Sequence, residues 1–146
     1  MTNTFLHQRF PALGQFRITS PATSDYNCIA WAAADTGRWW WPNPFSYWPK
    51  EAPNQVTLSA FQAAFRSQGY EVCEDSSVEE GYEKVALYTL DGEPKHAARQ
   101  LPNGRWTSKL GPWKDIEHET PESLEGPEYG MLAVIMRRLK IITTSQ

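Results

Sequence analysis

The chain has 146 residues, 40% of them hydrophobic, which is long enough to bury the core of one domain. Its net charge of −3 and the lack of a basic block argue against a nucleic-acid-binding protein. No apolar run approaches the length of a membrane span. Residues 1–16 also lack the continuous apolar core of a signal peptide, so we expect a cytoplasmic protein.

We expect a single domain over residues 1–146, in three parts along the chain. Residues 1–24, with several Pro, Gly, Ser and Thr residues, predict a loop-rich N-terminal arm whose aromatic residues pack on the body. Within this arm, residues 16–19 have the pattern of a short edge strand. Residues 25–69 form a helical part with a Trp-rich loop, and residues 70–146 an antiparallel sheet part.

A polar loop ends at Asn27, and the alanine-rich run 28–35 predicts a short helix that begins at Cys28. The unpaired N–H groups and the positive dipole end of a helix N-terminus favour a thiolate. We therefore expect a lowered pKa for Cys28, which makes it a candidate nucleophile. The alternative is that Cys28 is an inert, small buried residue.

Residues 38–49 contain three consecutive Trp followed by further aromatic residues and three Pro, so they cannot form a regular element. We expect a rigid aromatic loop that either covers the core or forms the wall of a substrate groove. The candidate substrate-binding residues are aromatic: Trp31, Trp39, Trp40, Trp41, Tyr47 and Trp48.

Amphipathic spacing predicts a helix over 57–68, with Thr57 as N-cap. Strands are predicted over 70–73, 84–90, 94–101 and 105–110. The turn sequences Asp91-Gly92 and Asn103-Gly104 join the last three into an antiparallel meander, with His96 near the start of its middle strand. We expect one helical turn at 115–118 and a final strand over 131–142.

The order of a Cys helix, a second helix and a sheet carrying His96 resembles the papain-like cysteine hydrolases, including the NlpC/P60-like enzymes. The matching residues are Cys28 in YNCIAWA (26–32) and His96 in PKHAAR (94–99). The chain also resembles an uncharacterised bacterial domain family, through the Cys stretch, the Trp-rich loop and WTSKLG (106–111). The first resemblance implies an α+β, papain-like/NlpC-P60-like fold in which N-terminal helices pack on an antiparallel β-sheet meander.

The papain-like resemblance implies that Cys28 is the nucleophile and His96 its base, forming a thiolate–imidazolium pair. It also implies an orienting residue on the next strand, where Ser108 stands in place of the usual Asn, Asp or His. Ser108 and Asp115 are the candidates for that role, and the Asn27 side chain is a candidate oxyanion donor. Glu117 and His118 are alternatives for the orienting residue, whereas Arg105 and Lys109 are expected to be solvated charges.

The chain has two cysteines and three scattered histidines, whose spacing gives no CxxC or HxxxH signature. We therefore expect neither a metal site nor a cofactor. Without an export signal, Cys28 and Cys73 are expected to be free thiols, although the sequence leaves open that they pair.

Three functional hypotheses follow from these residues. The first is a cysteine hydrolase or acyltransferase acting on a peptide or amide bond through Cys28 and His96. The second is a catalytically inactive papain-like domain that binds a protein or peptide through the Trp-rich loop. The third is an effector-type or immunity-type partner protein with a large apolar interface. The sequence specifies neither the substrate nor the oligomeric state.

Overall fold

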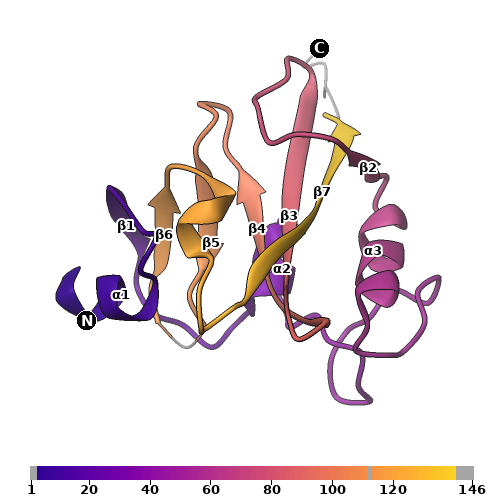
Figure 1. The fold of residues 1–146 in the computed structure, drawn as a ribbon. Helices are drawn as coiled ribbons and strands as arrows, with labels where there is room; N and C mark the ends of the chain where they lie inside the picture. The colour runs from indigo at the N-terminus through magenta and orange to yellow at the C-terminus, as the bar shows by residue number, and fades with distance from the viewer. Residues whose placement is uncertain (1–2, 112, 141–146) are drawn as a thin grey trace, which may run out of the picture.

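A computed structural model describes residues 3–111 and 113–140 of the chain. Seven strands form one sheet in the order β1-β6-β5-β4-β3-β7-β2, and every neighbouring pair is antiparallel (Figure 1). The strands are β1 (Phe16–Ser20), β2 (Glu71–Cys73), β3 (Tyr82–Leu90), β4 (Glu93–Gln100), β5 (Trp106–Lys109), β6 (Asp115–His118) and β7 (Met131–Leu139).

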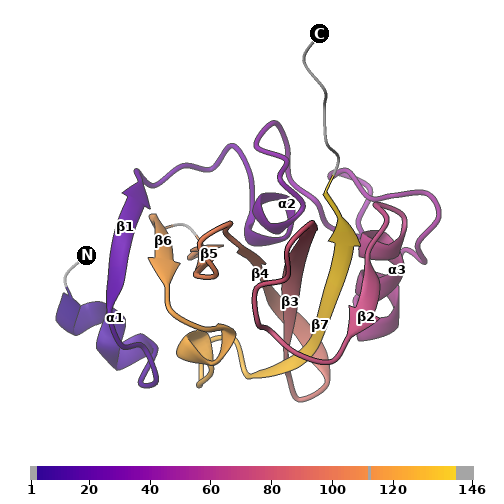
Figure 2. The same ribbon diagram turned by 90° about the horizontal axis from the view of Figure 1, so that it is seen from above.

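Short helices cover both faces of this sheet. Helices α2 (Cys28–Ala32) and α3 (Leu58–Arg66) lie on one face, whereas α1 (Asn3–Arg9) and the 3-10 helix η1 (Pro121–Leu124) lie on the other (Figure 2). None of the helices in the described part of the chain has the length and apolar character needed to cross a membrane.

The sheet separates two hydrophobic cores, because side chains alternate across each strand. Ala97 of β4 faces the core under α2 and α3, which also contains Ile29 and Phe61. Ala98 faces the other core, with Phe10 and the neighbouring strands. His96 shares the face of Ala98 and contacts the aromatic rings of that second core.

The expected papain-like fold, with N-terminal helices packed on a meander, is wrong. The molecule is mostly a seven-stranded antiparallel sheet, and α1, α2 and α3 have only 7, 5 and 9 residues. The meander predicted over 84–110 is present as β3, β4 and β5, but β6 and β1 extend it on one side and β7 and β2 on the other. Pairing between segments so far apart in sequence leaves no mark on local patterns.

Two local expectations also need correction. The helical turn predicted at 115–118 is strand β6, because Ile116 pairs with Ser108 on one side and with Ile18 on the other. The N-terminal arm contains helix α1, which was not predicted, and it buries Leu6 and Phe10. The final strand ends at Leu139, and the predicted positions 141 and 142 lie outside the described residues.

Candidate functional site

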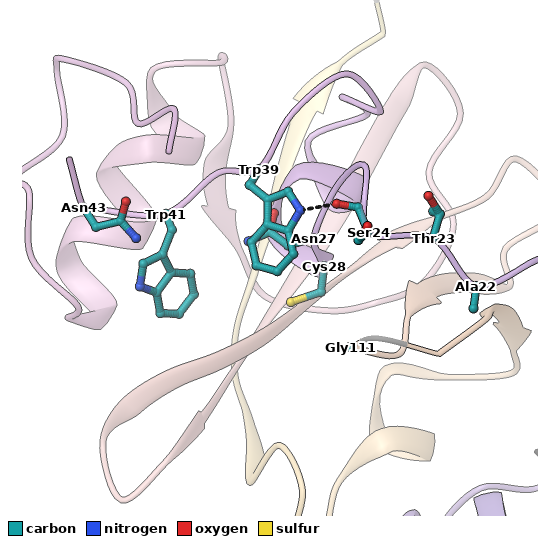
Figure 3. Close-up of a pocket in the computed structure, with 9 residues that line it drawn as sticks. All are labelled: Ala22, Thr23, Ser24, Asn27, Cys28, Trp39, Trp41, Asn43 and Gly111. Atoms are coloured by element: carbon teal, nitrogen blue, oxygen red, sulfur yellow. Dashed lines mark hydrogen bonds between the residues drawn. The ribbon is translucent and has the colours of Figure 1, made fainter. Parts of the chain in front are cut away.

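A pocket of about 870 Å³ opens where α2 begins. Figure 3 shows the Cys28 sulfur inside it, beneath the ring of Trp39. The lining comes from the segment before α2, from the Trp-rich loop and from the turn after β5, and carries no charged side chain. Its residues are Ala22, Thr23, Ser24, Asn27, Cys28, Trp39, Trp41, Asn43 and Gly111.

Asn27 sets both the start of α2 and the course of the Trp-rich loop. Its Oδ1 accepts the Ala30 N–H at 3.1 Å, so it caps the helix and leaves Cys28 as the first helical residue. The same Oδ1 accepts the Trp40 N–H at 3.1 Å, and Nδ2 donates to the Trp40 carbonyl at 2.8 Å. The amide expected to bind an oxyanion therefore holds the loop.

Trp40 is the buried anchor of the Trp-rich loop. Its indole N–H donates to the Asp35 carboxylate at 2.9 Å, and its ring packs against Tyr47. Trp40 points into the core, whereas Trp39 and Trp41, which precede and follow it in the chain, line the pocket.

The Cys28 thiol is not the activated thiol that the sequence predicts. Burial raises its pKa to about 11, although the backbone N–H groups of Ala97, Ile29 and Cys28 itself and the ammonium of Lys109 act in the opposite direction. The donors expected at a helix N-terminus are present, but the loss of hydration outweighs them. Cys28 is therefore protonated at neutral pH.

A chain of buried hydrogen bonds begins at His96. His96 Nε2 lies 3.0 Å from Ser108 Oγ, which lies 2.8 Å from His118 Nε2. His118 Nδ1 in turn lies 2.9 Å from the carbonyl oxygen of Thr120. All three side chains are at most 1% exposed, and they come from the adjacent strands β4, β5 and β6.

The Thr120 carbonyl determines the tautomer of both histidines, because a carbonyl oxygen only accepts hydrogen bonds. His118 must carry its proton on Nδ1, which leaves Nε2 to accept the Ser108 hydroxyl proton. Ser108 Oγ then accepts from His96, whose proton is on Nε2. His96 Nδ1 is left with a lone pair, and it is buried without a hydrogen-bond partner among the described residues.

Both histidines are neutral at pH 7. Burial, and secondarily the charge of His118, holds the pKa of His96 well below its usual value. Burial also lowers the pKa of His118 to about 4, against the opposing effect of the Thr120 carbonyl. A neutral thiol and a neutral imidazole therefore replace the ion pair that the sequence predicts.

Tyr129 contacts His96, and the charge of Cys28 affects its pKa. Its ring stacks on the His96 ring with the centroids 4.0 Å apart and the planes 3° from parallel. Burial, followed by the charge of a Cys28 thiolate, raises the pKa of Tyr129. No hydrogen bond joins Cys28 to His96 among the described residues. Cys28 packs against the core under α2, whereas His96 contacts the rings of the second core, so the two groups are not a preformed pair.

Several predicted site residues lie outside the pocket. Trp31 donates to Thr107 Oγ1 at 3.1 Å and stacks on Tyr26, while Tyr47 and Trp48 pack in the core under α3. Asp115 accepts the Tyr26 hydroxyl proton at 2.7 Å, and His96 is bonded to Ser108 instead.

Lys109 was expected to be a solvated charge, and this is wrong. Only 1% of the residue is exposed. Its Nζ donates to the Gly111 carbonyl at 2.9 Å and to the Trp113 carbonyl at 3.3 Å. Arg105, in contrast, is partly exposed and pairs with Glu117. Lys109 thus holds the turn that contributes Gly111 to the pocket.

Sequence reasoning missed the pocket residues Ser24, Asn43 and Gly111 and the ring of Tyr129, because no local pattern marks them. The sequence offers His118 only as an alternative for the orienting residue, because it lies beyond the strand that follows the His96 strand; the structure joins it to Ser108. Cys28 and Cys73 are both free thiols. The described residues contain no group of three or more His, Cys, Asp or Glu side chains arranged to hold a metal ion.

A family model described as a domain of unknown function (DUF7689) matches residues 17–137. The matched range contains Cys28, His96, Ser108 and His118. That description names no activity, and nothing in it links the chain to the papain-like hydrolases. No curated protein and no solved structure matches the chain.

Proposed function

The chain belongs to the DUF7689 family, and from its site we propose that it is a cysteine-dependent hydrolase or acyltransferase of peptide or amide bonds. Cys28 is the nucleophile and His96 the general base. The observation that carries the proposal is the buried lone pair on His96 Nδ1, which has no partner among the described residues. A buried polar atom without a hydrogen bond costs about 1–3 kcal/mol, and a catalytic role explains why it is retained.

The first step begins from the neutral thiol and the neutral imidazole. As the Cys28 sulfur attacks the substrate carbonyl carbon, the thiol proton moves through water to His96 Nδ1, because the two side chains lie toward opposite faces of β4. The carbonyl oxygen takes the negative charge. The backbone N–H groups of Ala97, Ile29 and Cys28 itself act on the sulfur, and we propose the N–H of Cys28 as a donor to that charge.

The second step breaks the C–N bond, and the amine leaves with the proton from His96 Nδ1. The acyl group remains on Cys28 as a thioester. Water, or an amine acceptor in the transferase case, then attacks the thioester while His96 takes its proton. The C–S bond breaks, the acid or new amide leaves, and the proton returns to the thiol.

Ser108 and His118 position the base in this scheme. Ser108 accepts the Nε2–H of His96 in both protonation states of the ring, so Nδ1 remains the basic nitrogen throughout the cycle. His118 fixes the direction of the Ser108 hydroxyl, because its Nε2 accepts the Ser108 proton.

The test is acylation by p-nitrophenyl acetate, followed by intact-mass measurement and peptide mapping. We expect one acetyl group on Cys28 that decays by hydrolysis, and none in Cys28→Ala. His96→Ala should slow acylation by about 10²-fold or more, the usual contribution of a general base. The matched control is His7→Ala, at an exposed histidine in α1. Equal acylation of wild type and His96→Ala would reject the proposal.

A second candidate function is peptide or protein binding without catalysis through the Trp-rich loop. It is favoured by the exposure of Trp39 and Phe45, which are 47% and 94% exposed. The acylation experiment separates the two candidates, because a binding domain forms no thioester at Cys28 that depends on His96.

A further inference from the structure

We propose that the pocket accepts an uncharged substrate whose apolar side chain, aromatic or branched aliphatic, lies between Trp39 and Trp41. This inference rests on the proposed function, since it names the substrate class of the same site. It concerns which group is bound beside Cys28, and it can be tested without turnover.

The first argument is the charge of the lining, because none of the nine residues that line the pocket carries a charged side chain. A charged group brought into such a site loses its hydration without gaining a counter-charge. The buried ammonium of Lys109 acts on Cys28 from behind the wall. That ammonium repels a cationic side chain, and the carboxylate of Asp115 already opposes its charge, which weakens its attraction for an anionic one.

The second argument is that both indole rings are fixed before any ligand binds. The Trp39 indole N–H donates to the Ser24 carbonyl at 2.6 Å and so joins two segments that line the pocket (Figure 3). The Trp41 backbone N–H donates to the Tyr47 carbonyl at 3.0 Å, and its ring meets the Phe61 ring edge-on at a centroid distance of 5.3 Å. Rigid aromatic surfaces bind apolar groups at a low cost in conformational entropy.

The third argument is a polar group placed to orient an amide. Asn43 Oδ1 accepts the Phe45 N–H at 2.8 Å, while its Nδ2 makes no hydrogen bond with the rest of the described chain. Asn43 lines the pocket near Trp41 (Figure 3). An apolar pocket with one free amide donor suits a substrate that combines an apolar side chain with a backbone carbonyl.

The test uses the full chain with Cys28→Ala, so that binding is measured without acylation. The probes are four N-acetyl amino-acid amides that differ only in side chain: phenylalanine, leucine, glutamate and lysine. Binding is followed by NMR of the assigned Trp indole N–H signals. We expect the phenylalanine and leucine amides to shift the Trp39 and Trp41 signals, and the charged amides to bind at least about tenfold more weakly.

Further substitutions in the Cys28→Ala protein then identify the residues that contact the phenylalanine amide. Trp41→Ala and Trp39→Ala should each weaken the phenylalanine amide about tenfold, and Trp41→Phe, which keeps an aromatic ring on Phe61, should weaken it less. The matched control is Phe45→Ala, an exposed aromatic of the same loop that does not line the pocket. With Phe45→Ala added, the Cys28→Ala protein should bind the phenylalanine amide as tightly as it does without that substitution.

The inference is overturned if the charged amides bind as tightly as the apolar ones, if Phe45→Ala weakens binding as much as Trp41→Ala, or if none of the four amides binds. These outcomes differ from a failure of the proposed function. A pocket selective for apolar amides, in a protein that forms no acetyl thioester, leaves this inference standing as a binding specificity.

Discussion

The hydroxyl of Ser108 is a buried partner of His96, 3.0 Å from its Nε2. A serine hydroxyl has one proton, so it can satisfy two histidines only by accepting from one and donating to the other. His118 must donate its Nδ1–H to the Thr120 carbonyl, so its Nε2 accepts the Ser108 proton. The Ser108 oxygen can then only accept from His96, and the proton of His96 lies on Nε2. We predict that ¹⁵N NMR finds His96 as the Nε2–H tautomer and His118 as the Nδ1–H tautomer at pH 7. The opposite tautomer for His96 would remove its basic lone pair from Nδ1.

Replacing Ser108 with Ala removes the partner of two buried ring nitrogens at once. Each unsatisfied buried group costs about 1–3 kcal/mol, so we expect Ser108→Ala to lower the free energy of unfolding by about 2–5 kcal/mol. Urea denaturation measures this loss. The control is Ser59→Ala, at an exposed position of α3, which should change stability by less than about 0.5 kcal/mol. A small loss for Ser108→Ala would show that the hydroxyl does not bridge the histidines.

Stability should fall in acid because of the two buried histidines. The pKa of His118 is about 4 in the folded chain and about 6.5 when unfolded, so between these values the unfolded state binds more protons. Stability from His118 is therefore full above pH 6.5 and is lost as the pH falls toward 4, by about 3 kcal/mol. His96 acts in the same direction.

The variant His118→Asn tests this origin of the acid sensitivity. An Asn amide keeps a donor near the place of Nδ1 but does not titrate. The slope of unfolding free energy between pH 6.5 and 4 should be smaller in His118→Asn than in wild type, and unchanged in the control His7→Asn. Parallel slopes in all three proteins would assign the acid sensitivity to other groups.

The parts of the fold that follow from local pattern were predictable. The helix over 57–68, the start of α2 at Cys28 and the β3–β4–β5 meander depend on caps, helical spacing and two-residue turns, which neighbouring residues encode. The seven-stranded sheet was not predictable in this way. The segment 115–118 has no strand pattern, and it becomes β6 only because β5 and β1 pair with it on both sides.

Sequence reasoning selected the candidate residues, but it could not give their electrostatics. Cys28, His96 and Ser108 are marked by element order, and the structure places Ser108 against His96. The sequence does not reveal how deeply each group is buried, and burial reverses the expected pKa direction of Cys28. Lys109 was misjudged for the same reason, because a charged residue on a predicted strand gives no sign that it will be covered.

The thiol of Cys28 should react slowly with iodoacetamide at neutral pH. With a pKa of about 11, fewer than about one thiol in a thousand is ionised at pH 7.4, and the thiolate is the reactive form. The alkylation rate, followed by mass mapping, should rise about tenfold per pH unit up to pH 10. Cys28→Ala identifies the signal from Cys73. Fast alkylation of Cys28 with an inflection below pH 8.5 would contradict a thiol that is protonated at neutral pH.

The positive charge of the buried Lys109 ammonium should lower the pKa of the Cys28 thiol. Its positive charge opposes the effect of burial on the thiol, so Lys109→Met should move the pH dependence of Cys28 alkylation to higher pH. The control is Lys95→Met, a partly exposed lysine paired with Glu93 on β4, which should leave the profile unchanged. An unchanged profile in Lys109→Met would show that the Lys109 ammonium does not affect the Cys28 thiol and only donates hydrogen bonds to the carbonyls of Gly111 and Trp113.

Asn27 should be more important for stability than an ordinary helix cap. Thr57 caps α3 with a bond to the Ala60 N–H, and Thr57→Ala should cost about 1 kcal/mol. Asn27→Ala loses the Ala30 bond and also both bonds to the Trp40 backbone, whose N–H and carbonyl are then unsatisfied. We expect a cost of about 3 kcal/mol or more, measured by urea denaturation. Since Trp40 anchors the loop, Asn27→Ala should also shift the indole N–H signals of Trp39 and Trp41. Equal costs for the two caps, with unshifted indole signals, would mean that the loop holds its shape without Asn27.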